Sequence, residues 1–350
     1  TGTMVQKNKH IIHYCCGSYD IGDFGGVARY DYQLKTVFPN RVFFRGPQQK
    51  NEMLAYLNRL GDPKNIIIFT DNHLACDIPN KFFVYLVHHG CARTTAKFNP
   101  DWEEPWKSLC CKGQDLMLDI RDPNKTQIIT ISQSCTDDFI SYYGDKYNKF
   151  KRHKILHSSE LDEVKDLPFH KDPPLRGGEH AVLDKEKNKI IKVLGNWNHI
   201  KKGKHIIPKI VDKETRFDMI QLSVFPTQSV SINDSDSKRN SNINKYNENK
   251  KQIYTKNDIF LQLSNSEGNS YATLDALACG TPVVSTKVGL FYKDVPDDCF
   301  VSLDTNKLKP GVEDINYILE RLNYAYNNRK ELSLNAKKWY TRTYSFSNWK

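Results

Sequence analysis

No stretch of the 350-residue sequence approaches the roughly 18 consecutive apolar residues that a membrane-spanning helix needs. The chain also opens without the charged and apolar segments that mark a secretory signal peptide. Residues Thr1-Gly2-Thr3 ahead of Met4 are typical of a residual tag. These absences favour a cytoplasmic protein, and contact with a membrane would be peripheral.

The sequence has no C-x-x-C pair, and its nine cysteines fit no zinc-binding spacing. Two adjacent pairs occur, Cys15-Cys16 and Cys110-Cys111, and adjacent cysteines rarely bridge each other. We therefore expect reduced thiols that pack rather than bind or bridge. The single D-x-D triplet, Asp234-Ser235-Asp236, lies in an Asn- and Ser-rich stretch without rigid support, so we expect no metal and no other cofactor.

Acidic residues are too few to balance the basic ones, and the net charge is +10. This charge favours an anionic partner: a nucleotide diphosphate, an acidic acceptor, a membrane surface or a nucleic acid. The lysines are dispersed among acids, and no basic module interleaved with aromatic residues is visible. Nucleic acid is therefore the least favoured partner of the four.

Apolar runs typical of buried strands alternate along the chain with patterns of helical period. This alternation predicts an α/β fold with parallel sheets, whose ligands bind beyond the carboxyl ends of the strands. A charged stretch rich in Pro and Gly, at about 162–178, predicts a linker. We expect an N-terminal Rossmann-like domain over residues 1–175 and a C-terminal one over 176–350, with a polar loop at about 228–245 and a helix after it.

The most informative run is SNSEGNSYATLDALACGTPVVST at 264–286. An apolar strand at 258–263 leads into a polar turn, and Leu274 and Leu277 then repeat at helical spacing. Gly280 stands where a left-handed C-cap belongs, Pro282 bars continuation, and PVVST reads as a buried strand. The free N–H groups of such a helix terminus attract phosphate.

Two acidic residues flank that helix terminus. Glu267 precedes the helix and Asp275 lies within it, about 12 Å further along the axis at roughly 1.5 Å per residue. This span suits a ligand with hydroxyl groups at both ends and a charged linker between them. A nucleoside-diphosphate sugar has that shape.

The same run resembles the E-x7-E glycosyltransferases of the GT-B fold, family 4, also called glycosyl transferases group 1. The family pattern is a strand, S-x-x-E-G, a helix and A-x-G-x-P-V-V, which here become SNSEG at 264–268 and ACGTPVV at 278–284. The second acid is Asp275, one methylene shorter than the family's Glu. The resemblance implies two Rossmann-like domains facing across a cleft.

The resemblance also implies transfer of a sugar, with retained anomeric configuration, from a nucleotide-activated donor to a hydroxyl acceptor. Glu267 would hold the donor sugar, Asp275 the ribose, and Gly268, Asn269 and Ser270 the diphosphate. A second cationic element of the family is K-G, which Lys202-Gly203 matches, with Lys201 beside it. The family's arginine position is occupied by the uncharged Asn196.

The first domain carries weaker signals. Gly25 and Gly26, after the first strand, form a loop that lets backbone amides approach a phosphate or a sugar. His88-His89 ends the strand FFVYLV; we favour His89 as the residue facing the donor sugar, with His88 on the opposite face because strand side chains alternate. Arg93 is the candidate cation for an anionic acceptor.

Two other functions fit the same residues. A sugar-nucleotide epimerase of the GT-B fold shares the donor but needs no acceptor. A catalytically inactive nucleotide-sugar-binding protein is compatible with the departures at Asp275 and Asn196.

Overall fold

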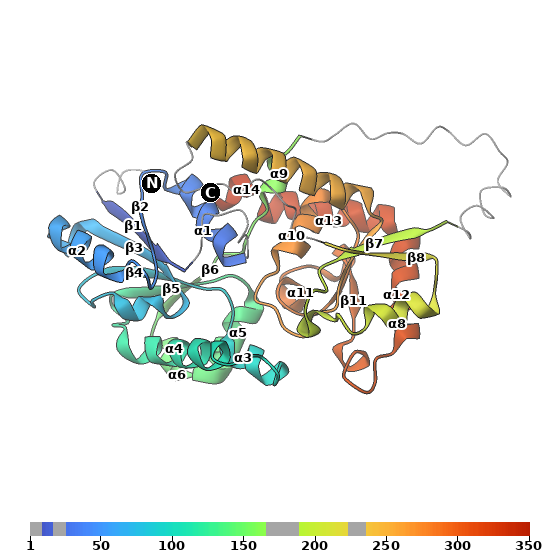
Figure 1. The fold of residues 1–350 in the computed structure, drawn as a ribbon, viewed down its shortest axis with the longest axis horizontal. Helices are drawn as coiled ribbons and strands as arrows, with labels where there is room; N and C mark the ends of the chain where they lie inside the picture. The colour runs from blue at the N-terminus through green and yellow to red at the C-terminus, as the bar shows by residue number, and fades with distance from the viewer. Residues whose placement is uncertain (1–8, 17–25, 166–188, 223–235) are drawn as a thin grey trace.

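The structure is a computed structural model that describes residues 9–16, 26–165, 189–222 and 236–350. Its strands form two parallel sheets, one built before residue 155 and the other after residue 190. Figure 1 shows them as two α/β units side by side, blue to green and yellow to red. The predicted α/β architecture is therefore confirmed. The predicted boundary at 175/176 falls outside the described residues.

The N-terminal sheet has the strand order β2-β1-β3-β4-β5-β6. Its central strands are largely apolar because helices cover both faces, as in β3, where five of six residues are buried. The strands are β1 (His10–Cys15), β2 (Val42–Arg45), β3 (Ile66–Asp71), β4 (Phe83–His88), β5 (Thr126–Thr130) and β6 (Lys151–Lys154). The helices are α1 (Gly26–Val37), α2 (Lys50–Leu60), α3 (Ala92–Phe98), α4 (Trp106–Ile120), α5 (Gln133–Tyr143) and α6 (Asp145–Asn148).

The C-terminal sheet has the order β11-β10-β9-β7-β8. All of its pairings are parallel, so the carboxyl ends of its strands share one edge. The strands are β7 (Ile191–Gly195), β8 (Phe217–Gln221), β9 (Ile259–Gln262), β10 (Val283–Thr286) and β11 (Val301–Leu303). The helices are α8 (Ile207–Lys213), α9 (Asp236–Lys256), α10 (Tyr271–Cys279), α11 (Leu290–Lys293), α12 (Ile315–Asn327), α13 (Arg329–Tyr344) and α14 (Phe346–Trp349).

The end of the chain returns to the N-terminal domain. Helix α13 packs against α10, and α14 lies beside α1 in Figure 1. There Trp349 meets Tyr30 edge to face at 5.9 Å, and the N–H of Phe346 donates to Asp162. The last two helices therefore tie the two domains together.

One expectation for this region was wrong. The stretch at about 228–245 was predicted to be a loop, but α9 already begins at Asp236. Helix α9 packs against α10 and against the short turn η4 (Glu160–Glu163). Tertiary packing therefore supports a helix whose polar sequence gives little sign of it. Of the D-x-D triplet, Asp234 and Ser235 lie outside the described residues.

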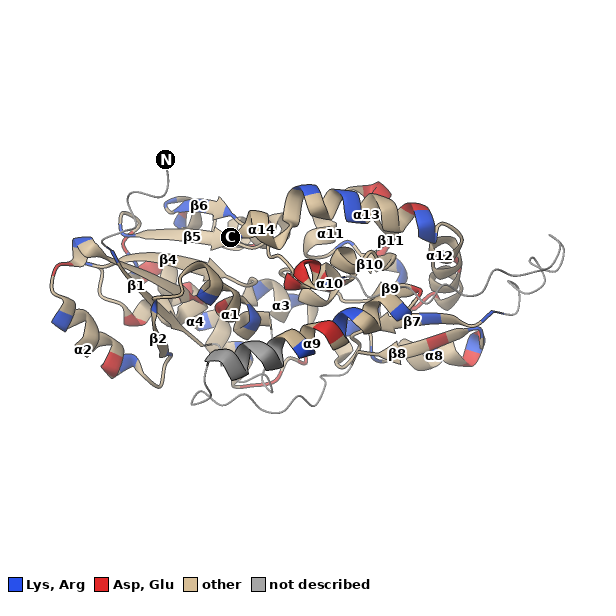
Figure 2. Cartoon of the chain, turned by 90° about the horizontal axis from the view of Figure 1, so that it is seen from above, with Lys and Arg blue, Asp and Glu red and all other residues tan. Residues whose placement is uncertain are grey.

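Charge is spread rather than gathered in the view of Figure 2, where basic and acidic residues alternate along α8, α9 and α13. Among the described residues no helix combines the length and apolar character needed to cross a membrane. All nine cysteines are free thiols.

Candidate functional site

The predicted donor residues meet at the carboxyl edge of the C-terminal sheet. Lys202 closes the short turn η5 (Ile200–Lys202) after β7, and Glu267 follows β9. The Lys202 Nζ lies 3.5 Å from the Glu267 Oε1, which also accepts a hydrogen bond of 2.9 Å from the Ser264 hydroxyl. Both side chains are largely buried, 22% and 13% exposed, so a cation and a carboxylate are held together with little solvent screening.

The turn that follows Glu267 requires glycine. A Cβ on Gly268 would lie 2.2 Å from the carbonyl oxygen of His89, and Gly90 is also in contact there. Gly289, at a φ of +58°, approaches the same turn, and a Cβ on it would lie 3.3 Å from the Glu267 Cβ. The family's E-G pair thus allows the two domains to approach backbone to backbone.

Hydrogen bonds connect this turn to the N-terminal domain. Ser132 caps α5 by accepting from the Cys135 N–H, and its hydroxyl donates to the Gly268 carbonyl. The Asn269 amide donates to the Ile131 carbonyl at 3.0 Å. The structure therefore packs the segment at the amino end of α10 against the opposing domain, with Asn269 7% exposed.

Helix α10 has the termini that the sequence predicts. It begins after Ser270, whose side chain makes no capping hydrogen bond, and it ends at Gly280 in the left-handed conformation with a φ of 70°. Within the described part of the chain, the backbone N–H groups of Asn269, Ser270 and Tyr271 donate to no other backbone group. They are available as anion-binding donors.

Asp275 has partners other than those the resemblance implies. Arg29 of α1 donates to both of its carboxylate oxygens, at 2.6 and 2.8 Å, and Lys250 of α9 lies 2.9 Å away. The Ser159 hydroxyl adds a bond of 2.6 Å. Asp275 is 0% exposed. A ribose therefore has no access to this carboxylate in the described arrangement, and the ribose contact stays a prediction that requires the Arg29 bond to open.

Electrostatics fix the charge of this cluster. Burial alone raises the pKa of Asp275, but the Arg29 and Lys250 charges outweigh it and bring the pKa from 3.8 down to about 2. Arg29 also pairs with Glu160 at 3.0 Å and stacks over the Tyr271 ring at 4.5 Å. The cluster joins α1, η4, α9 and α10, so it is an ionic contact between the two domains.

The two histidines after β4 differ in their surroundings. His88 lies fully buried and stacks on Phe139 with ring centroids 4.0 Å apart. The ring of His89 instead meets those of Tyr30 and His157, with centroids 5.1 and 5.8 Å away. Burial, and secondarily the nearby His13, lowers the pKa of His89 to about 3, so its imidazole is neutral at physiological pH.

The remaining predicted residues do not all lie near the Lys202–Glu267 pair. The Asn196 Oδ1 accepts from the Gln221 side-chain amide at 3.3 Å, and the Lys201 carbonyl accepts from the Asn265 N–H. Arg93 pairs with Asp115, and both side chains are partly exposed. Gly26 opens α1, and a Cβ on it would lie 3.6 Å from the Tyr271 ring. Gly25 lies outside the described residues.

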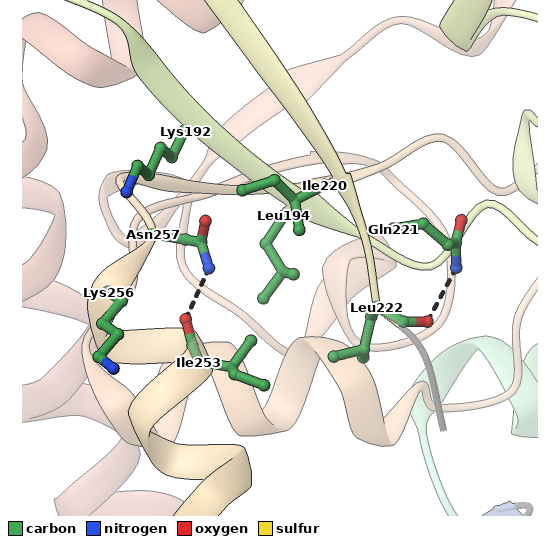
Figure 3. A pocket seen from close by; sticks show the side chains of 8 residues that line it. All are labelled: Lys192, Leu194, Ile220, Gln221, Leu222, Ile253, Lys256 and Asn257. Carbon is green, nitrogen blue, oxygen red and sulfur yellow. Dashed lines mark hydrogen bonds between the residues drawn. The ribbon is translucent and has the colours of Figure 1, made fainter. Parts of the chain in front are cut away.

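The C-terminal domain has a cavity whose lining includes Gln221, the hydrogen-bond partner of Asn196. It lies between the β7–β8 pair and the end of α9, and the side chains of Leu194, Ile220, Leu222 and Ile253 supply its apolar lining (Figure 3). Lys192, near the start of β7, and Asn257, ahead of β9, also line it. Leu194 and Gln221 lie at the carboxyl ends of β7 and β8, so the cavity reaches the carboxyl edge, although neither Lys202 nor Glu267 lines it.

Several residues that lie close to the predicted site residues could not be predicted from the sequence. Arg29 carried no signal because its partner is 246 positions away. Asp31 and Asp71 carried none either, since they are single acids within α1 and at the end of β3. Gly289 had one usable signal: it follows the strand PVVST by three positions, as a glycine turn at a carboxyl edge would.

Comparison with known proteins identifies a family for part of the chain. Residues 238–339, from α9 into α13, match the family model described as Glycosyl transferases group 1. The chain carries a group 1 glycosyltransferase domain. The matched range contains both Glu267 and Asp275, and the resemblance read from the sequence is confirmed. A comparison with curated protein sequences found no match.

Solved structures place this glycosyltransferase domain within the GT-B fold. Sucrose-phosphate synthase from Thermosynechococcus elongatus is similar with a TM-score of 0.67 at 13% identity, over 97% of this chain and 96% of that one. Anabaena HepE, in complex with UDP and glucose, gives 0.63 at 12% identity over 97% of each chain. WaaG, a glycosyltransferase involved in lipopolysaccharide biosynthesis, gives 0.54 at 12% identity over 96% of each.

Proposed function

We propose that this protein is a retaining glycosyltransferase that moves a sugar, most simply a hexose, from a nucleotide-diphosphate sugar to a hydroxyl acceptor. One observation carries the proposal. A lysine and a glutamate from separate loops, Lys202 and Glu267, meet at 3.5 Å beside a helix terminus with available amides. The family match over residues 238–339 supports the same reaction class.

The chemistry follows from where charge develops. Breaking the bond between the anomeric carbon and the diphosphate leaves negative charge on the diphosphate oxygens. Lys202 and the amides at Asn269 and Ser270 stabilise that charge as it forms, and fixed donors in a poorly hydrated site lower a barrier most effectively. Glu267 accepts hydrogen bonds from the donor sugar. No metal ion is needed between this protein and the diphosphate, because lysine and amides supply the positive field.

His89 lies on the opposite wall of this site, next to Gly268 through its backbone. Its neutral imidazole is suited to hydrogen bonding with a sugar hydroxyl rather than to charge stabilisation. No side chain is assigned as general base, because in a front-face retaining reaction the leaving phosphate accepts the acceptor's proton. Lys201, Asn196 and Gly26 remain proposed donor-side contacts.

The acceptor is proposed only as a hydroxyl-bearing molecule. An anionic acceptor bound by Arg93 is weakly supported, since Arg93 is already paired with Asp115. The net charge of +10 still favours an anionic partner or a peripheral membrane surface.

The decisive experiment combines a donor screen with one variant. UDP-sugars are tested first, because the HepE structures contain UDP and UDP-glucose, followed by GDP- and TDP-sugars. Thermal stabilisation identifies the donor, and donor hydrolysis or transfer measures turnover. Lys202→Ala should lower kcat by about 100-fold or more. The exposed Lys204→Ala is the matched control and should not.

Three results would contradict the proposal. Equal turnover in Lys202→Ala and wild type would remove Lys202 from the mechanism. Complete loss of donor hydrolysis in EDTA, restored by manganese, would contradict metal-free stabilisation of the diphosphate. Release of an altered nucleotide sugar with no acceptor present would identify an epimerase, and donor binding without turnover would identify an inactive binding protein.

A further inference from the structure

Three side chains, of which the proposed reaction uses only His89, converge at the carboxyl edge of the N-terminal sheet. Asp31 comes from α1, Asp71 ends β3, and His89 follows β4. One ligand atom from each lies within 4.8 Å of the other two. Asp31 is 3% exposed and Asp71 is 1% exposed, so both carboxyl groups are removed from water.

Two of these side chains carry a buried atom with no hydrogen-bond partner. The Asp71 Oδ2 and the His89 Nε2 are both buried and unpaired. The other Asp71 oxygen accepts from the N–H and the Sγ of Cys16, each at 3.3 Å. A buried carboxylate oxygen and a buried imidazole nitrogen left unpaired side by side indicate a ligand that both can bind.

The ligand must be positive and small. Two buried carboxyl groups at this separation repel each other when ionised, and a cation between them turns that repulsion into attraction. Ligand atoms within 4.8 Å of one another can all contact a single ion placed between them. Carboxylate oxygens combined with an imidazole nitrogen are ligands of zinc, manganese and iron, whereas calcium and magnesium prefer oxygen alone.

We propose that Asp31, Asp71 and His89 form a binding site for one divalent transition-metal ion, such as Zn²⁺ or Mn²⁺. Ligand bonds of about 2.0–2.2 Å place the ligand atoms no more than about 4.4 Å apart. The observed separations therefore need only a small inward movement of the side chains.

A neighbouring set, His13, Cys15 and Asp31, also lies within 4.8 Å, but it is excluded by its protons. The Arg41 Nε–H donates to the His13 Nδ1 at 3.1 Å, so the proton of the neutral ring is on Nε2. That Nε2 faces the Asp31 Oδ1 at 3.3 Å. His13 therefore orients Asp31 by a hydrogen bond and offers no lone pair to a metal.

One consequence rests on the proposed function. A metal ion on the His89 Nε2 fixes the remaining ring proton on Nδ1, which makes that nitrogen a permanent hydrogen-bond donor. The ion would then position His89 for a sugar hydroxyl without touching the diphosphate. Metal binding and sugar transfer can be measured separately, so failure of either proposal is distinguishable from failure of the other.

The test is metal binding by the full-length protein. After dialysis against a chelator, Zn²⁺ and Mn²⁺ are titrated by calorimetry, and Co²⁺ is titrated by its visible absorption, which reports imidazole and carboxylate ligation. One equivalent should bind. Asp71→Asn and His89→Gln should each weaken binding by about 100-fold or more, while the exposed Asp119→Asn should bind as wild type does. Lys202→Ala should keep full metal binding even as turnover falls.

Four outcomes would overturn the site. They are absence of binding at millimolar metal, binding that survives Asp71→Asn, binding lost in Cys16→Ser but kept in Asp71→Asn, and equal loss in Asp119→Asn. Circular dichroism of the metal-free variants separates a lost ligand from a lost fold. Anomalous scattering at the zinc edge, from crystals of the wild type, provides a measurement that needs no variant: a peak between Asp71 and His89 is expected, and a peak elsewhere or none refutes the site.

Discussion

The buried ion pair between Arg29 and Asp275 should make a large contribution to the free energy of unfolding. Removing one member of a buried pair leaves an uncompensated charge, which typically costs about 3–5 kcal/mol. Here each partner keeps a second ion pair, Arg29 with Glu160 and Asp275 with Lys250. We therefore expect Arg29→Met and Asp275→Asn each to cost about 3 kcal/mol, at the low end of that range.

The assay is urea unfolding followed by tryptophan fluorescence and circular dichroism, with the double variant completing a cycle. The double variant should lose about 1.5 kcal/mol or more less stability than the two single losses added together, because it removes both charges of the pair at once. Lys146→Met is the control: its exposed pair with Asp119 should contribute at most about 1 kcal/mol.

Two results would refute this reasoning. If Arg29→Met unfolds at the same urea concentration as wild type, the pair does not hold the domains. If the single effects add without coupling, the observed costs arise from lost packing rather than from the ion pair. A nucleotide that binds Asp275 through its ribose should bind more tightly to Arg29→Met, since the competing guanidinium is then absent.

Three further predictions concern contacts between the two domains. The free energy of unfolding should fall by about 2 kcal/mol as the pH drops from about 4 to 2. The pKa of Asp275 is 3.8 in the unfolded chain and about 2 in the folded protein, so its carboxylate stabilises the fold only while it is ionised. Asp275→Asn should flatten this part of the pH–stability curve. Gly268→Ala should destabilise the protein by about 1–3 kcal/mol and reduce kcat/KM at least about tenfold, because its Cβ would lie 2.2 Å from the His89 carbonyl; an unchanged melting temperature and rate would contradict the close approach. Ser132→Ala should cost about 1 kcal/mol by removing the cap of α5 and the bond to Gly268, and Ser134→Ala, which caps nothing, should be neutral in the same melt.

Local sequence pattern determined the elements and the motif. Apolar runs alternating with helical periodicity predicted two α/β domains, because a buried parallel strand and an amphipathic helix each impose a repeat that neighbouring residues carry. Gly280 was predicted as a left-handed cap, since only glycine adopts that conformation without strain, and it has a φ of 70°. The S-x-x-E-G turn indicated the donor side, because its residue types and spacing are all contained in one short segment.

Position along the chain could not predict which charges meet. Asp275 looked like a free acid on a helix, and only the placement of α1 against α10 gives it Arg29 as a partner. The start of α9 was missed for a related reason, because its stability comes from packing on α10 and η4 rather than from its polar sequence.

The same limit applies to Asp31, Asp71 and His89, which lie on three separate elements and converge only because parallel strands end at one edge. A sequence determines periodicity and turn chemistry, which act between neighbours. Ion pairing and ligand sites depend on distances through space, and those are decided only when the sheets are assembled and the two domains pack together.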